Sequence, residues 1–435
     1  MIRVPQVRVL LDDEEAEHRS IADCQLRGGY TAYCIAKDEA NRELLINEIE
    51  KSQLIGKGGA GYPTHRKMRL MLSQTGARKI LVVNGSEHEP GSVKDRYLLE
   101  NYPHKVLEGA LIAAYAVAAT EIVIAVNESS TLALASLAGA VEELQATDLT
   151  RADVSIIVKT VPEIYIVGEE TALLETLEGK KPLPRVKPPF PIVQGLYGVP
   201  TLVQNVETVA HLPFIFLQGA VAYRDLGPSS KGVTLCTLGE EFATPGVYEI
   251  TLGTSIHDIL YLCGNGLRNG LEIKCIQPGG PSSGFLSSSN FALPLDPAAL
   301  SANGTALGCA VIRAYSVDEC MVRRVGEIMH FFAHASCGQC PKCRMETNML
   351  DTIIRQVHSG SGSRKLLDKV EDIIKFASGQ GICSLISMPV APIRTALQLF
   401  HEEFTAHLDN GCTRCAAHGV AADADMAAVT DAYHG

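Results

Sequence analysis

The 435-residue sequence has no long run of lysine or arginine, and its net charge is −11. Proteins that bind nucleic acid usually cluster basic side chains to neutralise backbone phosphates, so the charge argues against a nucleic-acid partner. Hydrophobic residues make up 46% of the chain and charged residues 20%. This balance excludes a disordered protein and leaves room for two to four globular domains.

The sequence also lacks an uninterrupted apolar stretch that could cross a membrane. The nearest candidate, residues 106–126, is broken by Glu108 and Glu121. Its first part is rich in alanine and typical of a helix, whereas its end is β-branched and typical of a strand. We expect a buried helix followed by a core strand, and no direct membrane span.

No apolar segment typical of a secretion signal opens the sequence, and the 13 cysteines are an odd number. Both features favour a reducing, cytoplasmic location. Peripheral attachment to a membrane complex stays open.

Four of the cysteines form a pattern. Cys337, Cys340 and Cys343 follow one another at C-x2-C-x2-C spacing, and Cys383 comes later. One tight loop can direct three sulfurs to a common centre, and a distant fourth closes the site, as in a [4Fe–4S] cluster. A structural zinc site usually divides its thiolates into two pairs, so zinc is the weaker interpretation. Disulfides and separately buried thiols are the remaining alternatives.

Residues 54–64 are rich in glycine, with Gly56, Gly58, Gly59 and Gly61 within six positions. A backbone without Cβ atoms can approach a phosphate or a flat ring and offer its N–H groups. The spacing does not match the G-x-G-x-x-G dinucleotide fingerprint. A plain flexible turn explains the segment equally well.

Strand and helix patterns alternate after this loop, which predicts a mostly parallel sheet covered by helices. We expect strands over 79–84, 121–127 and 154–160, a helix over 132–145, and a further strand that ends at Gly168 and opens a helix. Polar residues follow the first strand, where α/β proteins place ligands. They are Asn84, Ser86, Glu87 and Glu89, and a solvated acidic loop is the alternative.

Two later segments carry further candidates. The stiff, proline-rich loop with Lys187 and Phe190 could stack an adenine and pair with a phosphate, or could serve as a rigid linker. The pair Glu169 and Glu170 begins a helix, where acidic residues also favour the helix dipole without any ligand.

Taken together, these motifs resemble the NADH-binding, FMN-carrying subunit of respiratory complex I. They also resemble the diaphorase subunits of NAD-linked hydrogenases and formate dehydrogenases. Seven motifs occur in one order, which is far more specific than any one of them. They are residues 56–64, 84–91, 168–172, 187–190, 195–198 and 205–208, and the four-cysteine site.

The resemblance implies an α/β fold with additional domains. It places an N-terminal segment at 1–50, a Rossmann-like FMN/NAD-binding domain at 51–225, a small ubiquitin-like β domain at 230–310, a helical bundle with the [4Fe–4S] site at 314–408, and a tail at 409–435. Ser316 and Glu319 form a capping-box pattern that predicts the first helix of the bundle.

The resemblance also implies the site residues. Glu89 and Glu170 would orient the dinucleotide and tune the flavin as the catalytic carboxylates. The cluster ligands would be Cys337, Cys340, Cys343 and Cys383. The FMN and NAD(H) contacts would be Gly56, Gly58, Gly59, Gly61, Tyr62, Lys67, Asn84, Ser86, Glu87, Gly168, Glu169, Lys187, Phe190, Gln204, Asn205 and Thr208.

The implied activity is that of an NADH dehydrogenase (diaphorase) subunit, which moves electrons between NAD(H) and a partner iron–sulfur subunit through FMN and a [4Fe–4S] cluster. Leu70 replaces a usual aromatic residue and His65 a usual glycine. Both changes motivate an alternative, a flavin and iron–sulfur relay between ferredoxin-like partners without NAD. A scaffold subunit without cofactors is a further alternative.

The last motif is Cys412-x-x-Cys415, which precedes an alanine- and aspartate-rich end. A bare C-x-x-C can be redox-active, can bind a metal, or can form half of a site between subunits. Because two further ligands are not evident nearby, we expect an unstructured tail from residue 409.

Overall fold

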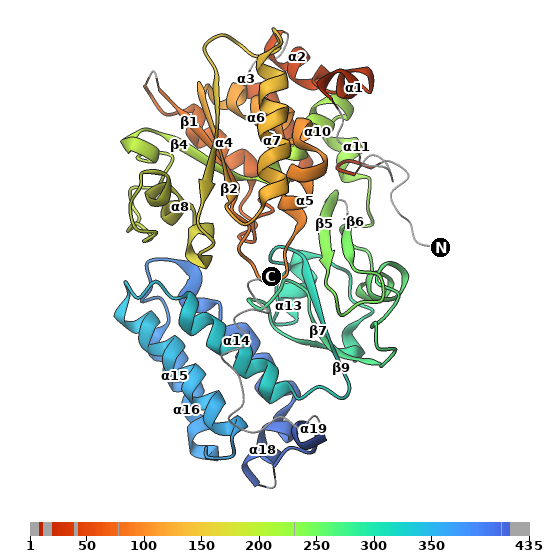
Figure 1. Cartoon of the computed structure of the whole chain (residues 1–435), viewed down its shortest axis with the longest axis vertical. Helices are drawn as coiled ribbons and strands as arrows, with labels where there is room; N and C mark the ends of the chain where they lie inside the picture. The colour runs from red at the N-terminus through yellow and green to blue at the C-terminus, as the bar shows by residue number, and fades with distance from the viewer. Residues whose placement is uncertain are drawn as a thin grey trace. The chain divides into compact units, whose positions relative to one another are not determined.

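The computed structural model describes residues 8–11, 20–38, 42–76, 78–229, 231–409 and 411–417 (Figure 1). The chain divides into two compact units. The first comprises Met1–His88, Ser92–Thr237 and Val247–Thr254, and the second comprises Glu89–Gly91, Leu238–Gly246 and Ser255–Gly435. The finer domain boundaries expected from the sequence stay a prediction.

The first unit is built on a four-stranded parallel sheet with the order β3-β2-β1-β4. Its strands are β1 (Ile80–Gly85), β2 (Glu121–Asn127), β3 (Ser155–Val161) and β4 (Thr201–Asn205). The predicted strands at 79–84, 121–127 and 154–160 are therefore confirmed within a residue or two. In the pairing register, Asn84 lies opposite Asn205, so β1 and β4 end at the same edge.

Both faces of this sheet are covered. Leu81 and Val83 belong to one apolar core, whereas Ile80 and Val82 belong to another. Successive side chains of a strand point to opposite faces, so continuous apolar strands suit a sheet that is buried on both sides.

The helices of the first unit supply the two cores. Helix α6 packs against β1 and β2, and a Cβ at its Gly109 would lie 2.0 Å from the Val209 carbonyl oxygen, so only glycine allows this approach to α9. The reading of 106–126 as helix then strand is confirmed. The bounds are α1 (Ile21–Leu26), α2 (Thr31–Asp38), α3 (Arg42–Ser52), α4 (Thr64–Leu72), α5 (Lys94–Asn101), α6 (Pro103–Val117), α7 (Thr131–Gln145), α8 (Glu170–Leu177), α9 (Val206–Ala210), α10 (Leu212–Gln218) and α11 (Ala220–Arg224), with short turns η1 (Tyr165–Gly168) and η2 (Leu196–Gly198).

The strand expected before Gly168 is wrong. Residues Tyr165–Gly168 form the 3₁₀ turn η1, and the edge strand β3 has already ended at Val161. Ile166 and Val167 are apolar because the turn itself is buried in the core.

The second unit contains a small sheet and a group of helices. Strand β7 (Ile273–Gln277) pairs antiparallel with β8 (Leu286–Ser287) and with β9 (Val311–Ser316). Strands β5 (Val233–Leu238) and β6 (Gly246–Thr251) neighbour each other, and most of their residues belong to the first unit. Short helical segments of this part of the chain are α12 (Ile256–Asp258), η3 (Ile259–Cys263), η4 (Ser288–Asn290) and α13 (Pro297–Ala302).

Figure 1 shows α14, α15 and α16 of the second unit beside one another, in agreement with their contacts. Helix α14 buries apolar side chains, including Val325, Ile328 and Phe332. The bounds are α14 (Met321–Ala335), α15 (Pro341–His358), α16 (Arg364–Ala377), η5 (Ser384–Ser387), α17 (Val390–Leu399), α18 (His401–Asp409) and α19 (Thr413–Ala417). No helix among the described residues combines the length and apolar character that a membrane crossing requires.

The expected start of α14 needs correction. Glu319 does accept a hydrogen bond from the Ser316 N–H at 3.1 Å, as a capping box predicts. The helix nevertheless begins at Met321, and its N-cap is Cys320, whose sulfur accepts from the Arg323 N–H. The Ser316–Glu319 bond closes the turn that precedes the helix.

Candidate functional site

The carboxyl edge of the parallel sheet gathers polar residues from three predicted motifs. The Asn84 amide donates to the Gly168 carbonyl oxygen at 3.2 Å, and Asn84 Oδ1 accepts from the backbone and hydroxyl of Ser86. On the neighbouring strand, Asn205 caps α9 and accepts from the Thr208 N–H. Parallel strands end at the same edge, which is where this fold class places ligands.

The glycine-rich loop folds onto the same edge. The Gly56 N–H donates to the Tyr62 carbonyl oxygen at 2.9 Å, which closes the loop on itself. The Lys57 N–H donates to Thr208 Oγ1 at 2.8 Å, and a Cβ at Gly58 would lie only 3.3 Å from the Asn205 Cβ. Gly59 and Gly61 have φ values of 97° and 61°, a region that favours glycine. The loop is therefore a defined structure, and not a plain flexible turn.

A buried amide at this edge has no partner among the described residues. Gln204, the next-to-last residue of β4, is buried, and its Nε2 donor makes no hydrogen bond. An unsatisfied buried donor costs roughly 1–3 kcal/mol. A ligand with ring acceptors, such as the isoalloxazine of FMN, would satisfy it, so the residues present fit the predicted cofactor.

Four charged residues form a cluster beside the start of α8. Lys67 Nζ lies 2.8 Å from Glu170, and Lys187 Nζ lies 2.9 Å from Glu169 and 3.1 Å from Glu170. Burial opposes ionisation of Glu170, but the two ammonium groups outweigh it and lower its pKa below the ordinary value. The pKa of Lys187 is raised, since its two carboxylate partners outweigh the effect of burial. Glu170 and Lys187 are therefore both charged at neutral pH.

Glu169 also supports the local fold. Its second carboxylate oxygen accepts from the N–H groups of Thr171 and Ala172 at 2.8 and 2.9 Å, which caps α8. The macrodipole role expected for this acidic pair is therefore present together with the lysine contacts.

Two exposed aromatic rings belong to the predicted motifs of this unit. Tyr62 is 44% exposed and Phe190 is 53% exposed, and Phe190 lies in the proline-rich loop. Exposed rings on structured loops are available for stacking against a flat ligand.

Glu87 and Glu89 are held in different ways. The Glu87 carboxylate accepts from the N–H groups of Asp95 and Arg96 at 3.0 and 2.7 Å, so it anchors its loop to the start of α5. Glu89 belongs to the second unit, where it accepts from the Ser282 N–H and hydroxyl at 3.2 and 2.7 Å. Their contacts with cofactor or substrate stay predictions.

Sequence reasoning missed a buried charge network behind the sheet edge. Lys94 Nζ lies 2.7 Å from Asp95 and 2.9 Å from Glu207, and Asp95 accepts from the Asn205 amide at 2.5 Å. Burial lowers the pKa of Lys57 to about 8 and raises that of Asp95 to about 7. Charged residues are normally expected on the surface. The adjacent Lys94-Asp95 pair and the Glu within the 205–208 motif were the available signals.

The predicted cluster cysteines lie around the first turn of α15. Cys340 is the N-cap of this helix, Cys343 lies in its first turn, and Gly338 between Cys337 and Cys340 has a φ of 75°. Cys383 precedes η5, and the neighbouring Ile382 N–H donates to Cys340 Sγ at 3.3 Å.

These thiols influence one another. The pKa of Cys343 is raised to about 11, mainly by burial and also by nearby Cys383 and Cys340, although a hydrogen bond with Ser336 opposes the rise. The N-terminus of α15 favours negative charge, as thiolate ligands require. Three closely spaced thiols at the start of one helix, with Cys383 nearby, fit the [4Fe–4S] prediction.

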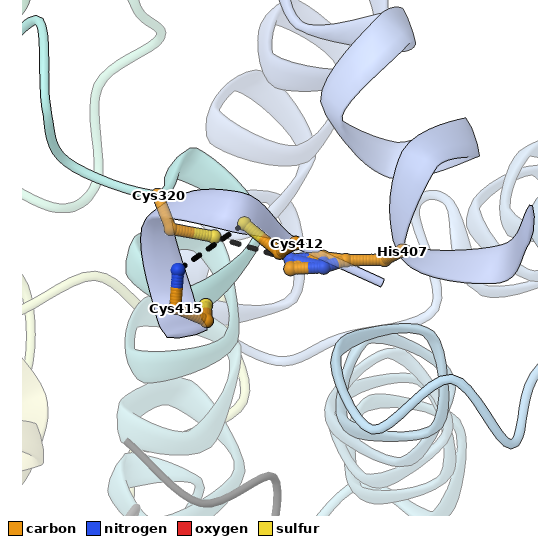
Figure 2. A group of neighbouring side chains, drawn as sticks. All are labelled: Cys320, His407, Cys412 and Cys415. Atoms are coloured by element: carbon orange, nitrogen blue, oxygen red, sulfur yellow. Dashed lines mark hydrogen bonds between the residues drawn. The ribbon is translucent and has the colours of Figure 1, made fainter. Parts of the chain in front are cut away.

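The unstructured tail expected from residue 409 is wrong for residues 411–417. Thr413–Ala417 form helix α19, and Cys412 and Cys415 lie with Cys320 and His407 (Figure 2). The two further ligands that seemed absent from the sequence come from elements far away along the chain. Residues 418–435 lie outside the described residues.

Two family models match the chain. The Nuo51 FMN-binding domain matches residues 49–213, and the NADH-ubiquinone oxidoreductase-F iron-sulfur binding region matches residues 323–407. The first range contains every residue predicted to contact FMN, and the second contains the four predicted cluster cysteines. Cys320, Cys412 and Cys415 lie outside both ranges.

Individual proteins match over most of their length. The NADH-quinone oxidoreductase F subunit of Streptomyces coelicolor is 37% identical over 377 residues, which cover 85% of this chain and 84% of that protein. The Escherichia coli F subunit is 33% identical over 438 residues, which cover 94% and 97%. A solved NAD+-reducing [NiFe]-hydrogenase in the H2-reduced state matches with a TM-score of 0.81 and 28% identity, over 90% of this chain and 68% of that one.

Proposed function

Because this chain belongs to the family of the F subunits of NADH-quinone oxidoreductases, we propose that it oxidises NADH and delivers the electrons to an iron–sulfur partner subunit through FMN and a [4Fe–4S] cluster. The observation that carries this function is the sheet edge. The glycine-rich loop is bonded to Thr208 of α9, β1 and β4 end side by side, and the buried Gln204 Nε2 near the end of β4 has no partner among the described residues.

The sheet edge would hold FMN. When bound, FMN supplies the conversion between the two electrons of a hydride and the single electrons that an iron–sulfur cluster accepts. The glycine loop offers its backbone, Gln204 offers its free amide, and Asn84, Asn205 and Thr208 define the walls of the site. The network of Lys94, Asp95 and Glu207 lies behind Asn205 and fixes its orientation.

The residues proposed for NAD(H) are the exposed Tyr62 and Phe190 and the charged cluster around Glu170. The rings would stack on flat parts of the dinucleotide. Glu170 is ionised at neutral pH, so it would orient the dinucleotide by accepting hydrogen bonds. An ionised carboxylate beside the adenosine ribose would repel a 2′-phosphate, which favours NADH over NADPH.

The cysteines at the start of α15 would hold the cluster, from which electrons leave to the partner. Cys340 and Cys383 lie near Cys343 in the structure, and Cys337 lies three residues before Cys340. The half-buried positions of Cys337, Cys340 and Cys383 suit a cluster that exchanges electrons across a protein surface.

Anaerobic stopped-flow absorption of the purified chain tests the function. NADH should bleach the flavin within the mixing experiment, and dithionite should then add no further flavin reduction. If dithionite reduces the flavin while NADH leaves it oxidised, the NAD-linked function is wrong and the relay between ferredoxin-like partners remains. Absence of flavin, iron and sulfide after reconstitution would favour a scaffold subunit.

A matched pair of variants sharpens this test. Lys187→Met changes the charged cluster and should slow flavin bleaching by NADH more than flavin reduction by dithionite. Lys180→Met removes an exposed lysine that contacts Glu178 in the same part of the unit and should change neither rate. Equal slowing of both reductants by Lys187→Met would contradict a role in NADH binding.

A further inference from the structure

A second group of ligand-type side chains lies in the second unit, apart from the predicted cluster cysteines. It consists of Cys320, His407, Cys412 and Cys415, whose three sulfur atoms and one ring nitrogen all lie within 4.8 Å of one another. Figure 2 shows these side chains converging from the start of α14, from α18 and from the segment around α19.

Each side chain is held by its own element. Cys320 is the N-cap of α14, and its sulfur accepts from the Arg323 N–H at 3.4 Å. His407 lies in the last turn of α18 and places Nε2 3.2 Å from Cys320 Sγ. The Cys415 N–H donates to Cys412 Sγ at 3.4 Å, so these two sulfurs sit on one turn of backbone.

Two of the four side chains are buried. Cys320 is 7% exposed and His407 is 4% exposed, whereas Cys412 and Cys415 are half-buried. Burial lowers the pKa of His407 to about 4, so the imidazole is neutral at physiological pH and has a lone pair that can bind a cation. A neutral imidazole and thiols that lose their protons to a cation are what a metal site requires.

We propose that Cys320, His407, Cys412 and Cys415 bind one zinc ion. Three thiolates and one imidazole are a common set for structural zinc, which takes four ligands in a tetrahedron. Bonds of about 2.3 Å in that geometry place neighbouring sulfurs about 3.8 Å apart. The observed separations below 4.8 Å suit one ion at the centre, and leave little room for a multinuclear iron–sulfur cluster.

A disulfide explains the positions of these four side chains less well than a metal ion does. No disulfide joins Cys412 to Cys415 in the described residues, and such a bond would leave the buried Cys320 and His407 in contact with each other but with no further role. His358 adds a further argument, since its Nε2 lies 3.5 Å from Cys415 Sγ. A donor beside a thiolate is a usual outer partner of a metal ligand.

The ion would be structural. Four protein ligands leave no open position for a substrate. It would connect the start of α14 to the end of α18, which are 87 residues apart at Cys320 and His407, and would fix the α19 segment beside them. The site requires neither flavin nor NADH, so its test does not depend on the proposed function.

Elemental analysis of the anaerobically purified full chain tests the proposal. We expect about one zinc per chain beside about four irons. Absorption at the zinc X-ray edge is not disturbed by iron and should give three sulfurs at about 2.3 Å and one nitrogen at about 2.0–2.1 Å. Chain that holds its iron but takes up no zinc after incubation with zinc would overturn the proposal, as would about eight irons per chain.

Variants then assign the ligands. The Cys412→Ser/Cys415→Ser double variant should lose its zinc and keep its iron, whereas Cys263→Ser, a half-buried cysteine of the same unit outside the group, should keep both. His407→Cys should retain zinc and convert the zinc-edge signal to four sulfurs, which separates loss of a ligand from loss of the fold. An unchanged signal in His407→Cys would contradict the assignment, and the wild-type zinc edge decides the proposal even if a variant fails to fold.

Discussion

The second unit holds two groups of cysteines that are built in different ways. Cys337, Cys340 and Cys343 lie within seven residues at the start of one helix, and only Cys383 comes from elsewhere. The other group draws Cys320, His407 and the Cys412–Cys415 turn from three separate elements. The first group is mostly half-buried, as suits electron exchange, whereas the core of the second is closed to solvent. The first site forms because its cysteines are close along the chain. The second forms because packing of the helices brings distant residues together.

Loss of one cysteine from the local site has the largest expected effect. Cys340→Ser should lose nearly all cluster iron, from about four atoms per chain to less than about one, because the helix cap holds a ligand that serine cannot replace. Flavin bleaching by NADH should persist, and zinc should stay at its wild-type level. Iron and zinc analysis with low-temperature paramagnetic resonance checks this, and joint loss of both metals would show that the two sites are not independent.

Removal of zinc tests the proposed zinc site formed by Cys320, His407, Cys412 and Cys415. A zinc chelator should release α18, α19 and the start of α14 together, since a ligand present at about 1,000 times its Kd contributes roughly 4 kcal/mol of stability. Amide hydrogen exchange should accelerate there and stay unchanged at the first turn of α15. Uniform acceleration across the helices would contradict a site that acts on these three segments.

His358 offers a smaller change at the same site. His358→Ala should weaken zinc binding by roughly 10–100-fold without removing the ion at saturating zinc, as loss of an outer hydrogen bond usually does. Competition with a coloured zinc chelator measures the affinity. Loss of one nitrogen from the zinc-edge signal in this variant would instead make His358 a ligand.

The sheet edge of the first unit resembles the proposed zinc site in one respect. The residues of both sites come from segments that are distant along the chain. Gln204→Leu removes the unpartnered amide and should weaken FMN binding by about 2–10-fold. The same change should stabilise the flavin-free protein by about 1 kcal/mol or more, since a buried unsatisfied donor disappears. Flavin fluorescence titration and thermal unfolding of the flavin-free form measure the two effects, with the exposed Gln194→Leu as control.

The Lys187→Met variant has the smallest expected effect, a loss of stability that depends on pH. The folded pKa of Glu170 is lowered, so its ion pairs stabilise the protein above pH 4.5 and this contribution is lost as pH falls through the folded pKa. Lys187→Met should cost about 1 kcal/mol near neutral pH, because both partners are partly exposed. The difference from wild type should narrow on acidification below pH 4.5. A difference that stays constant down to acid-induced unfolding would contradict this origin.

Sequence patterns found the regular parts of the fold. The strands at 79–84 and 121–127 are continuous apolar runs that are buried on both faces, whereas the edge strand at 154–160 is largely exposed. Ile166 and Val167 before Gly168 are also buried, yet they form a turn, because burial of side chains does not by itself supply a strand partner. The hydrogen bond between Ser316 and Glu319 that the capping-box pattern predicts is present. It does not lie at the start of the helix, because Cys320 is the N-cap of α14.

The sequence by itself therefore determined the features whose interacting residues are close along the chain. These are the sheet strands, the glycine loop, and three closely spaced thiols at the start of one helix. Only the tertiary structure decided which distant groups meet. It brought Gln204 to the sheet edge without a partner, buried Lys94 with Asp95 and Glu207, and joined His407 to three cysteines. The physical reason is that spacing along a backbone limits only local geometry, whereas contacts between distant elements follow from how their apolar faces pack.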